Sequence, residues 1–132
     1  MSLLNNIKKF FILNILKKET RLKYLFDHHF FVNQYYLQPA ASLENMSKIL
    51  NISTSHLNQI ALSNYAMDFE SLCKKYKFLH FWDEFTNPLN SHLPIESIIK
   101  IAGYLSNNDF SESILSHKEE SKYMFEKNYI LD

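Results

Sequence analysis

The sequence predicts an all-α protein made of two similar helical units that a longer helix joins, with further helices at the N-terminus. Apolar residues recur every three or four positions in most segments of the 132 residues, and no segment keeps the strict alternation of a half-buried strand. The chain has one glycine and three prolines, too few for the many tight turns of a β-rich fold. Hydrophobic residues make up 46% of the chain, which is ample for a core.

The second of the two units is predicted within residues 95–128. An apolar run of helical spacing begins at Ile95 and stops at Gly103, the only glycine. Ser106 then precedes a second helical pattern that includes Phe110, and Asp109, three residues after the serine, suits a capping box. A helix, a glycine turn and a capped helix are the parts of a helix-turn-helix.

The first unit is predicted from the same order of residues upstream, in residues 43–62. Leu43 aligns with Ile95, and Ser53 aligns with Ser106 once one residue is inserted in the second copy. Leu57 then corresponds to Phe110. The two copies indicate an internal repeat of helix-turn-helix units.

At these residues the sequence resembles the C-terminal DNA-binding domain of the bacterial AraC/XylS transcription regulators. LNISTSHLNQ (residues 50–59) resembles the first turn and recognition helix, and Met67-Asp68-Phe69 opens a segment that resembles the linker helix. TNPLNSHLPIESIIKIAGYLSNNDFSESI (residues 86–114) resembles the second unit. The resemblance covers about residues 36–128. It implies a seven-helix, all-α fold that binds DNA in the cytoplasm and regulates transcription.

The resemblance also implies the division of the chain. Residues 1–37 would form an N-terminal helical extension, and residues 38–132 the double helix-turn-helix domain. Within that domain we expect a first unit over 38–68, a linker helix over 69–86 and a second unit over 87–132. Caps are expected at Ser42, Ser53, Asp68 and Ser106, and a last helix over 120–131.

The N-terminal extension is expected to hold two helices, one after Leu3 and one over Leu22 to Tyr36. The first has a broad apolar face with lysines opposite it, and the second is rich in aromatic residues. Two interpretations stay open. The helices cover the DNA-binding domain, or they form a surface for a homodimer or a sensor partner, because so many exposed Phe and Ile side chains are unusual on a monomer.

The candidate DNA contacts follow from helical spacing and from the resemblance. In a helix-turn-helix the second helix enters the major groove, so its outward polar residues face the bases. Asn and Gln pair with adenine through two hydrogen bonds, and Ser contacts any base. The base-facing candidates are Ser55, Asn58, Gln59, Asn107, Asn108, Ser111 and Glu112, and the phosphate-binding candidates are Lys48, Lys74, Lys75 and Lys77.

Several features differ from a typical member of that family. The chain holds 14 basic and 14 acidic residues, whereas a DNA-binding domain normally has a basic excess. Gln59 and Glu112 stand where the family usually has arginine, and Ala66 and Glu119 where it commonly has glycine. An alternative function is therefore a diverged domain that no longer binds DNA and mediates protein–protein interaction.

Other function classes lack support in the sequence. Cys73 is the only cysteine, so no internal disulfide forms and nothing points to an oxidising compartment. His28 and His29 are adjacent and diverge on a helix, which makes a metal site improbable. No glycine-rich phosphate loop, serine elbow or HExxH motif occurs, so we expect no enzyme, no cofactor and no metal. No apolar run approaches the length of a membrane span, and we expect a cytoplasmic protein that does not bind membranes.

Overall fold

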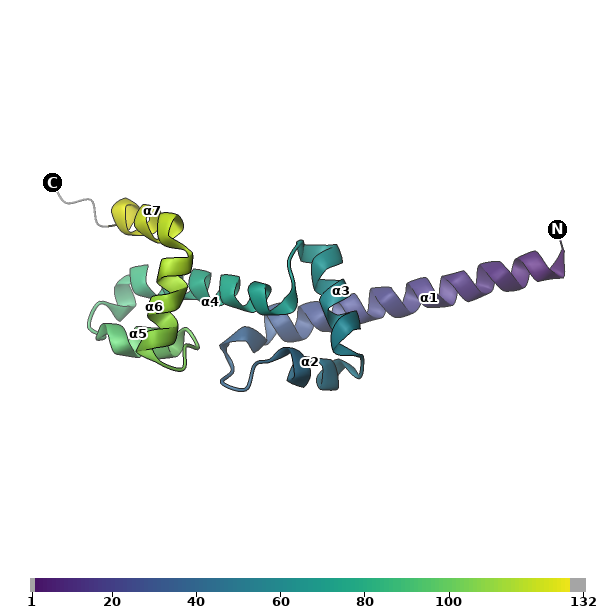
Figure 1. The fold of residues 1–132 in the computed structure, drawn as a ribbon, viewed down its shortest axis with the longest axis horizontal. Coiled ribbons are helices and arrows are strands. Elements are labelled where there is room, and N and C mark those ends of the chain that lie inside the picture. The colour runs from purple at the N-terminus through teal and green to yellow at the C-terminus, as the bar shows by residue number, and fades with distance from the viewer. Residues whose placement is uncertain (1, 129–132) are drawn as a thin grey trace.

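The computed structural model describes residues 2–128 and is entirely helical, so the predicted all-α class is confirmed (Figure 1). Seven α-helices and no strands occur in this part of the chain. The α-helices are α1 (Leu3–Asp27), α2 (Leu43–Leu50), α3 (Thr54–Tyr65), α4 (Phe69–Thr86), α5 (Ile95–Ile101), α6 (Asn107–Ser116) and α7 (Lys118–Asn128). Three short turns of other helix types are η1 (His28–Val32), η2 (Tyr35–Leu37) and η3 (Pro88–Asn90).

Helix α4 joins two lobes, each with its own core (Figure 1). Its first half gives Phe69 and Leu72 to lobe 1, where they meet buried side chains of α1, α2 and α3. Its second half gives Phe81 and Trp82 to lobe 2, where they meet α5 and the half-buried faces of α6 and α7. The expected linker helix therefore extends from one hydrophobic core into the other.

The N-terminal extension differs from the prediction of two separate helices. Helix α1 is continuous over 25 residues and runs directly into the π-helical turn η1. The physical reason is that residues 17–23, apart from Thr20, are strong helix formers and that no glycine or proline occurs before Pro39. Leu22, Phe26 and Phe30 are buried in lobe 1, so the second half of the extension belongs to the core of that lobe.

The first half of α1 projects away from both lobes (Figure 1). All its side chains from Leu3 to Lys18 are exposed. We call residues 3–18 the arm. Phe10 and Phe11 are each 65% exposed, whereas Phe26 and Phe30 are fully buried in the same chain. Both aromatic residues of the arm therefore lack cover, as does Tyr24, which is 68% exposed.

The four expected helix caps are confirmed. In each case the side-chain oxygen accepts a hydrogen bond from the backbone N–H three residues later, which satisfies one donor of the first turn. The N–H to oxygen pairs are Asn45 to Ser42 at 3.0 Å, His56 to Ser53 at 3.0 Å, Ser71 to Asp68 at 2.8 Å and Asp109 to Ser106 at 3.1 Å.

The turns after the helices show which residues adopt a left-handed backbone. Ala66, at the end of α3, has φ of 60°, so the position expected to favour glycine holds a strained alanine. Gly103, after α5, has φ of +86°. Glu119 does not match the expectation, because it lies in the first turn of α7 and is not among the positive-φ residues of the described chain.

Candidate nucleic-acid interface

Helix α3 presents a polar outer face because its apolar residues point into lobe 1. Leu57 is fully buried and Ile60 is 4% exposed. Ser55 and Gln59, on the opposite side of the helix, are exposed as expected. Both face outward near the N-terminal half of α3.

Asn58 is a correction to the predicted outward set. Its side chain is half-buried, and its Oδ1 accepts a hydrogen bond from the backbone N–H of Phe69 at 3.0 Å. The amide of Phe69 is the first of α4 and has no partner within that helix. Asn58 therefore ties α3 to the start of α4, and its carboxamide oxygen points away from the outer face.

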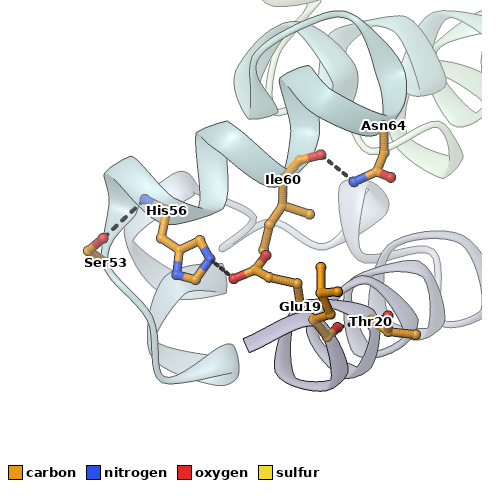
Figure 2. Close-up of polar contacts among 7 residues, drawn as sticks. Glu19, Thr20, Ser53, His56, Ile60 and Asn64 are labelled. Carbon is orange, nitrogen blue, oxygen red and sulfur yellow. Dashed lines mark hydrogen bonds and ion pairs between the residues drawn. The ribbon is translucent and has the colours of Figure 1, made fainter. Parts of the chain in front are cut away.

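The part of α1 that follows the arm lies beside α3. The spacing of residues within α3 could not reveal this contact with α1. The His56 ring Nε2 lies 2.7 Å from Glu19 Oε1 of α1, close to the Ser53 cap (Figure 2). The Tyr65 hydroxyl donates to Asp27 Oδ1 at the other end of α3. Burial and the Asp27 carboxylate hold the pKa of the Tyr65 hydroxyl well above its usual value.

Two further outer-face residues of α3 were missed by sequence reasoning. Leu62 is 52% exposed and Ser63 is exposed. Leu62 follows Ser55 by seven residues, and Ser63 follows Gln59 by four, so helical spacing alone could have placed them on the same face. Leu62 gives this face an apolar side chain that can contact a thymine methyl group.

Helix α6 exposes all four of its predicted base-facing residues. Asn107, Asn108, Ser111 and Glu112 are exposed, and Asn108 Nδ2 donates to Glu112 Oε1 at 3.4 Å. The Glu112 carboxylate is thus held over the N-terminal half of the helix. The opposite face is less deeply covered than that of α3, since no α6 residue is fully buried.

The contacts of α6 with the rest of lobe 2 explain its position. The Phe110 ring packs on Phe81 at 4.6 Å and on Tyr104 at 5.5 Å between centroids. The Tyr104 hydroxyl and the Ser113 hydroxyl are 2.8 Å apart. Burial raises the pKa of Tyr104, so this hydroxyl stays neutral at ordinary pH and remains a hydrogen-bonding group.

The four phosphate-binding candidates do not form one cluster. Lys48 is exposed on α2, and Lys75 lies 5.8 Å from the ring centroid of its neighbour Tyr76. Lys74 and Lys77 line a surface pocket of about 390 Å³ together with Asp109 and Glu112 of α6. The pocket places these two lysines beside acidic groups, which offset their positive charge.

Charge is unevenly distributed along the chain. Residues 1–23 contain six of the 14 basic residues and one of the 14 acidic ones. This region therefore has a net charge of +5, and residues 24–132, which include both predicted recognition helices, have a net charge of −5. The basic excess that DNA binding normally uses lies in α1.

Residues 2–128 hold neither a metal-binding cluster nor a helix that could span a membrane. No group of three or more His, Cys, Asp or Glu side chains is arranged to hold a metal ion there. No helix of that region combines the length and the apolar character needed to cross a membrane. Burial raises the pKa of the Cys73 thiol to about 12, so this thiol is a poor nucleophile.

Together these features define an all-α chain of two lobes with one polar helix face on each lobe. Comparison with protein-family models, with curated proteins and with solved structures finds no match for it.

Proposed function

We propose that the protein is a cytoplasmic, sequence-specific DNA-binding transcription regulator that uses α3 and α6 as two recognition helices. The observation that carries the proposal is the repeated arrangement of these helices. Each follows a short helix and a tight turn, each is capped by a serine, and each exposes polar residues in its N-terminal half. The N-terminal residues of a recognition helix are those that reach base edges.

The outer faces carry suitable chemistry for reading bases. Ser55 and Gln59 on α3, with Asn107, Asn108 and Ser111 on α6, offer hydroxyl and carboxamide groups to the major groove. A carboxamide pairs with adenine through two hydrogen bonds, which favours A·T-rich sites. Asn58 is left out of this set because its oxygen bonds to the backbone of Phe69.

Phosphate contacts would come from Lys48 and Lys75 and from the capped helix N-termini. Lys74 and Lys77 line one pocket with Asp109 and Glu112, so they contribute less than lysines far from acidic groups would. The predicted consequence is weak binding with a shallow dependence on salt, because few phosphate charges are neutralised.

The first experiment is a selection of bound duplexes from a random library with the full chain. Enrichment of an A·T-leaning motif with two half-sites about one helical turn apart is the expected result. Recovery of no motif at low salt would overturn the proposal.

Glu112→Arg provides the sharper test. It replaces an anion near the phosphates by a cation, so affinity should rise and the slope of log K against log salt should steepen by about one to two units. Gln59→Arg should act in the same direction by about one unit. Glu126→Arg, an exposed position on α7 with the same charge change as Glu112→Arg, is the matched control.

Fluorescence anisotropy of a labelled duplex, titrated with salt, measures the DNA affinity of the wild-type chain and of the three variants. A response to Glu126→Arg as large as that to Glu112→Arg would mean that charge, and not the α6 face, governs binding. No binding by any of the four chains would favour the second candidate function.

That second function is a protein–protein interaction module that no longer binds DNA. Two observations favour it. Residues 24–132 carry a net charge of −5, and the arm exposes large apolar side chains that neither lobe covers.

A further inference from the structure

The arm leaves much apolar surface exposed. Its nine Leu, Ile and Phe side chains between Leu3 and Leu16 are 47–76% exposed. At about 100 Å² for each half-exposed side chain of this size, they expose about 900 Å². The largest apolar patch of a typical monomer is about 300–600 Å², and each partner in a standard interface buries about 800 Å². The exposed area therefore exceeds the patch that a monomer usually leaves uncovered, and it is spread around all sides of the helix.

One row of these side chains lies on the same side of α1 as the residues that lobe 1 buries further along the helix. Leu4, Ile7, Phe11 and Ile15 are three or four residues apart, so they share one side of the helix. Leu22, seven residues after Ile15, extends the same row and is buried in lobe 1. The side of α1 that lobe 1 covers therefore continues along the arm without cover.

The pattern of the arm favours helical neighbours over a lipid surface. From Phe10 to Leu16 the only residue that is not apolar is Asn14. A helix that lies in a membrane surface needs a polar face directed to water, and this stretch has none. A helix that is apolar on all sides is normally packed among other helices.

We propose that the arm pairs with the arm of a second copy of this chain, in antiparallel orientation, through the row Leu4–Ile7–Phe11–Ile15. The row matches its own reverse: Leu4 lies opposite Ile15 of the second copy, and Ile7 lies opposite Phe11. This pairing is independent of DNA binding.

Charge selects the antiparallel orientation. The arm carries Lys8, Lys9, Lys17 and Lys18 and no acidic residue. A parallel pair sets each lysine beside its own equivalent, and Lys18 lies in the same row as Ile15 and Leu22. In the antiparallel pair Lys8 and Lys9 of the two copies lie near each other at the middle of the row, whereas Lys17 and Lys18 lie beyond the row of the second copy. The antiparallel pair thus brings two lysine positions of each arm close to their equivalents, whereas a parallel pair brings all four.

The principal test is the mass of the full chain by light scattering at rising concentration, in low and in high salt. A mass that approaches twice that of the chain is expected. The dimer should strengthen with salt, because salt screens the repulsion between two basic arms. A monomer at every concentration and salt would overturn the proposal.

Two variants test the row. Phe11→Asn should raise the dissociation constant at least tenfold. Leu13→Asn makes the same kind of change on a different side of the arm and is the matched control, with a much smaller expected effect. Both positions are exposed, so the fluorescence of Trp82 in lobe 2 and the melting of the lobes should stay as in wild type. A larger effect of Leu13→Asn would overturn the choice of row.

A double variant tests the orientation. Ile7→Glu combined with Phe11→Lys places opposite charges against each other in the antiparallel pair, and like charges in a parallel one. The double variant should dimerise more strongly than Ile7→Glu alone. A weaker dimer than that of the single variant would overturn the antiparallel assignment.

Anionic phosphatidylserine vesicles supply the competing outcome. Binding of the wild-type chain to these vesicles, lost in high salt and accompanied by a monomeric mass in solution, would assign the arm to a lipid surface and overturn the pairing.

Discussion

Gly103→Ala tests a residue on which both a turn and a contact between the lobes depend. Gly103 follows the Ala102 cap of α5 and has φ of +86°, a region that residues with a Cβ rarely adopt. A Cβ added there would lie 2.9 Å from Leu37 Cα and 3.1 Å from the Leu37 carbonyl oxygen. Leu37 belongs to η2 in lobe 1, so the substitution acts on the turn and on the packing of lobe 2 against lobe 1.

The expected loss follows from three effects. A non-glycine residue in the left-handed region costs about 1–2 kcal/mol. Alanine restricts the unfolded chain, which returns about 0.4–1 kcal/mol. The contact with Leu37 involves backbone atoms that cannot rotate away, and overpacking of this kind costs about 1–3 kcal/mol. The net destabilisation is about 1–5 kcal/mol.

Urea unfolding followed by fluorescence and by circular dichroism measures this loss. Trp82 is the only tryptophan and lies in the core of lobe 2, 5% exposed, so its fluorescence reports on that lobe. Circular dichroism reports on the helices of both lobes. A Gly103→Ala chain as stable as wild type by both probes would refute the reasoning.

The matched substitution is Ala66→Gly, the reverse change at the end of α3. Ala66 adopts φ of 60°, so glycine relieves about 1–2 kcal/mol of strain and loses about 0.4–1 kcal/mol through the unfolded chain. A gain of up to about 1.5 kcal/mol is expected. A loss of stability would mean that the alanine methyl group makes a compensating contact.

Three further predictions follow from burial and from the caps. Leu57→Ala should lower the free energy of unfolding in urea by about 2–5 kcal/mol, because Leu57 is fully buried. Phe110→Ala should lower it by less, because the Phe110 ring is only partly buried. The reverse order would show that the burial of these two side chains is misjudged. Asp68→Ala should cost about 1 kcal/mol at neutral pH. The hydrogen bond from the Ser71 N–H lowers the pKa of Asp68. The cap's contribution to stability is therefore complete above the unfolded pKa of about 3.9 and is lost as pH falls through the lower folded pKa. A difference in the free energy of unfolding between wild type and Asp68→Ala that is unchanged at pH 2 would contradict this. Iodoacetamide should modify Cys73 much more slowly in the native chain than in urea at pH 8, because burial raises its pKa to about 12, and equal rates would contradict the burial.

Local signals in the sequence determined most of the helices and the residues that cap them. Ser42, Ser53, Asp68 and Ser106 are all caps, because capping is an interaction between residues three apart and depends little on the rest of the fold. The buried position of Leu57 followed from helical spacing for the same reason. The all-α class is the sum of such local preferences.

Side-chain orientation at the candidate interface depended on residues distant in sequence. Asn58 turns inward because the first N–H of α4, eleven residues later, needs an acceptor. His56 meets Glu19 across 37 residues. Sequence spacing places a residue on a helix face, but it does not reveal which neighbouring element competes for its hydrogen bonds.

The tertiary structure also decided the surroundings of the arm and of Lys74 and Lys77. Helix α1 continues beyond lobe 1 because nothing in residues 17–23 ends it, whereas the part that is buried depends on where lobe 1 stops. Lys74 and Lys77 lie beside Asp109 and Glu112 only because α4 and α6 pack together. The sequence by itself therefore determined the class of fold and the helix caps. The packing of distant helices decided which polar groups face outward and which apolar surface stays exposed. The reason is that burial and charge pairing depend on contacts between segments far apart in the chain.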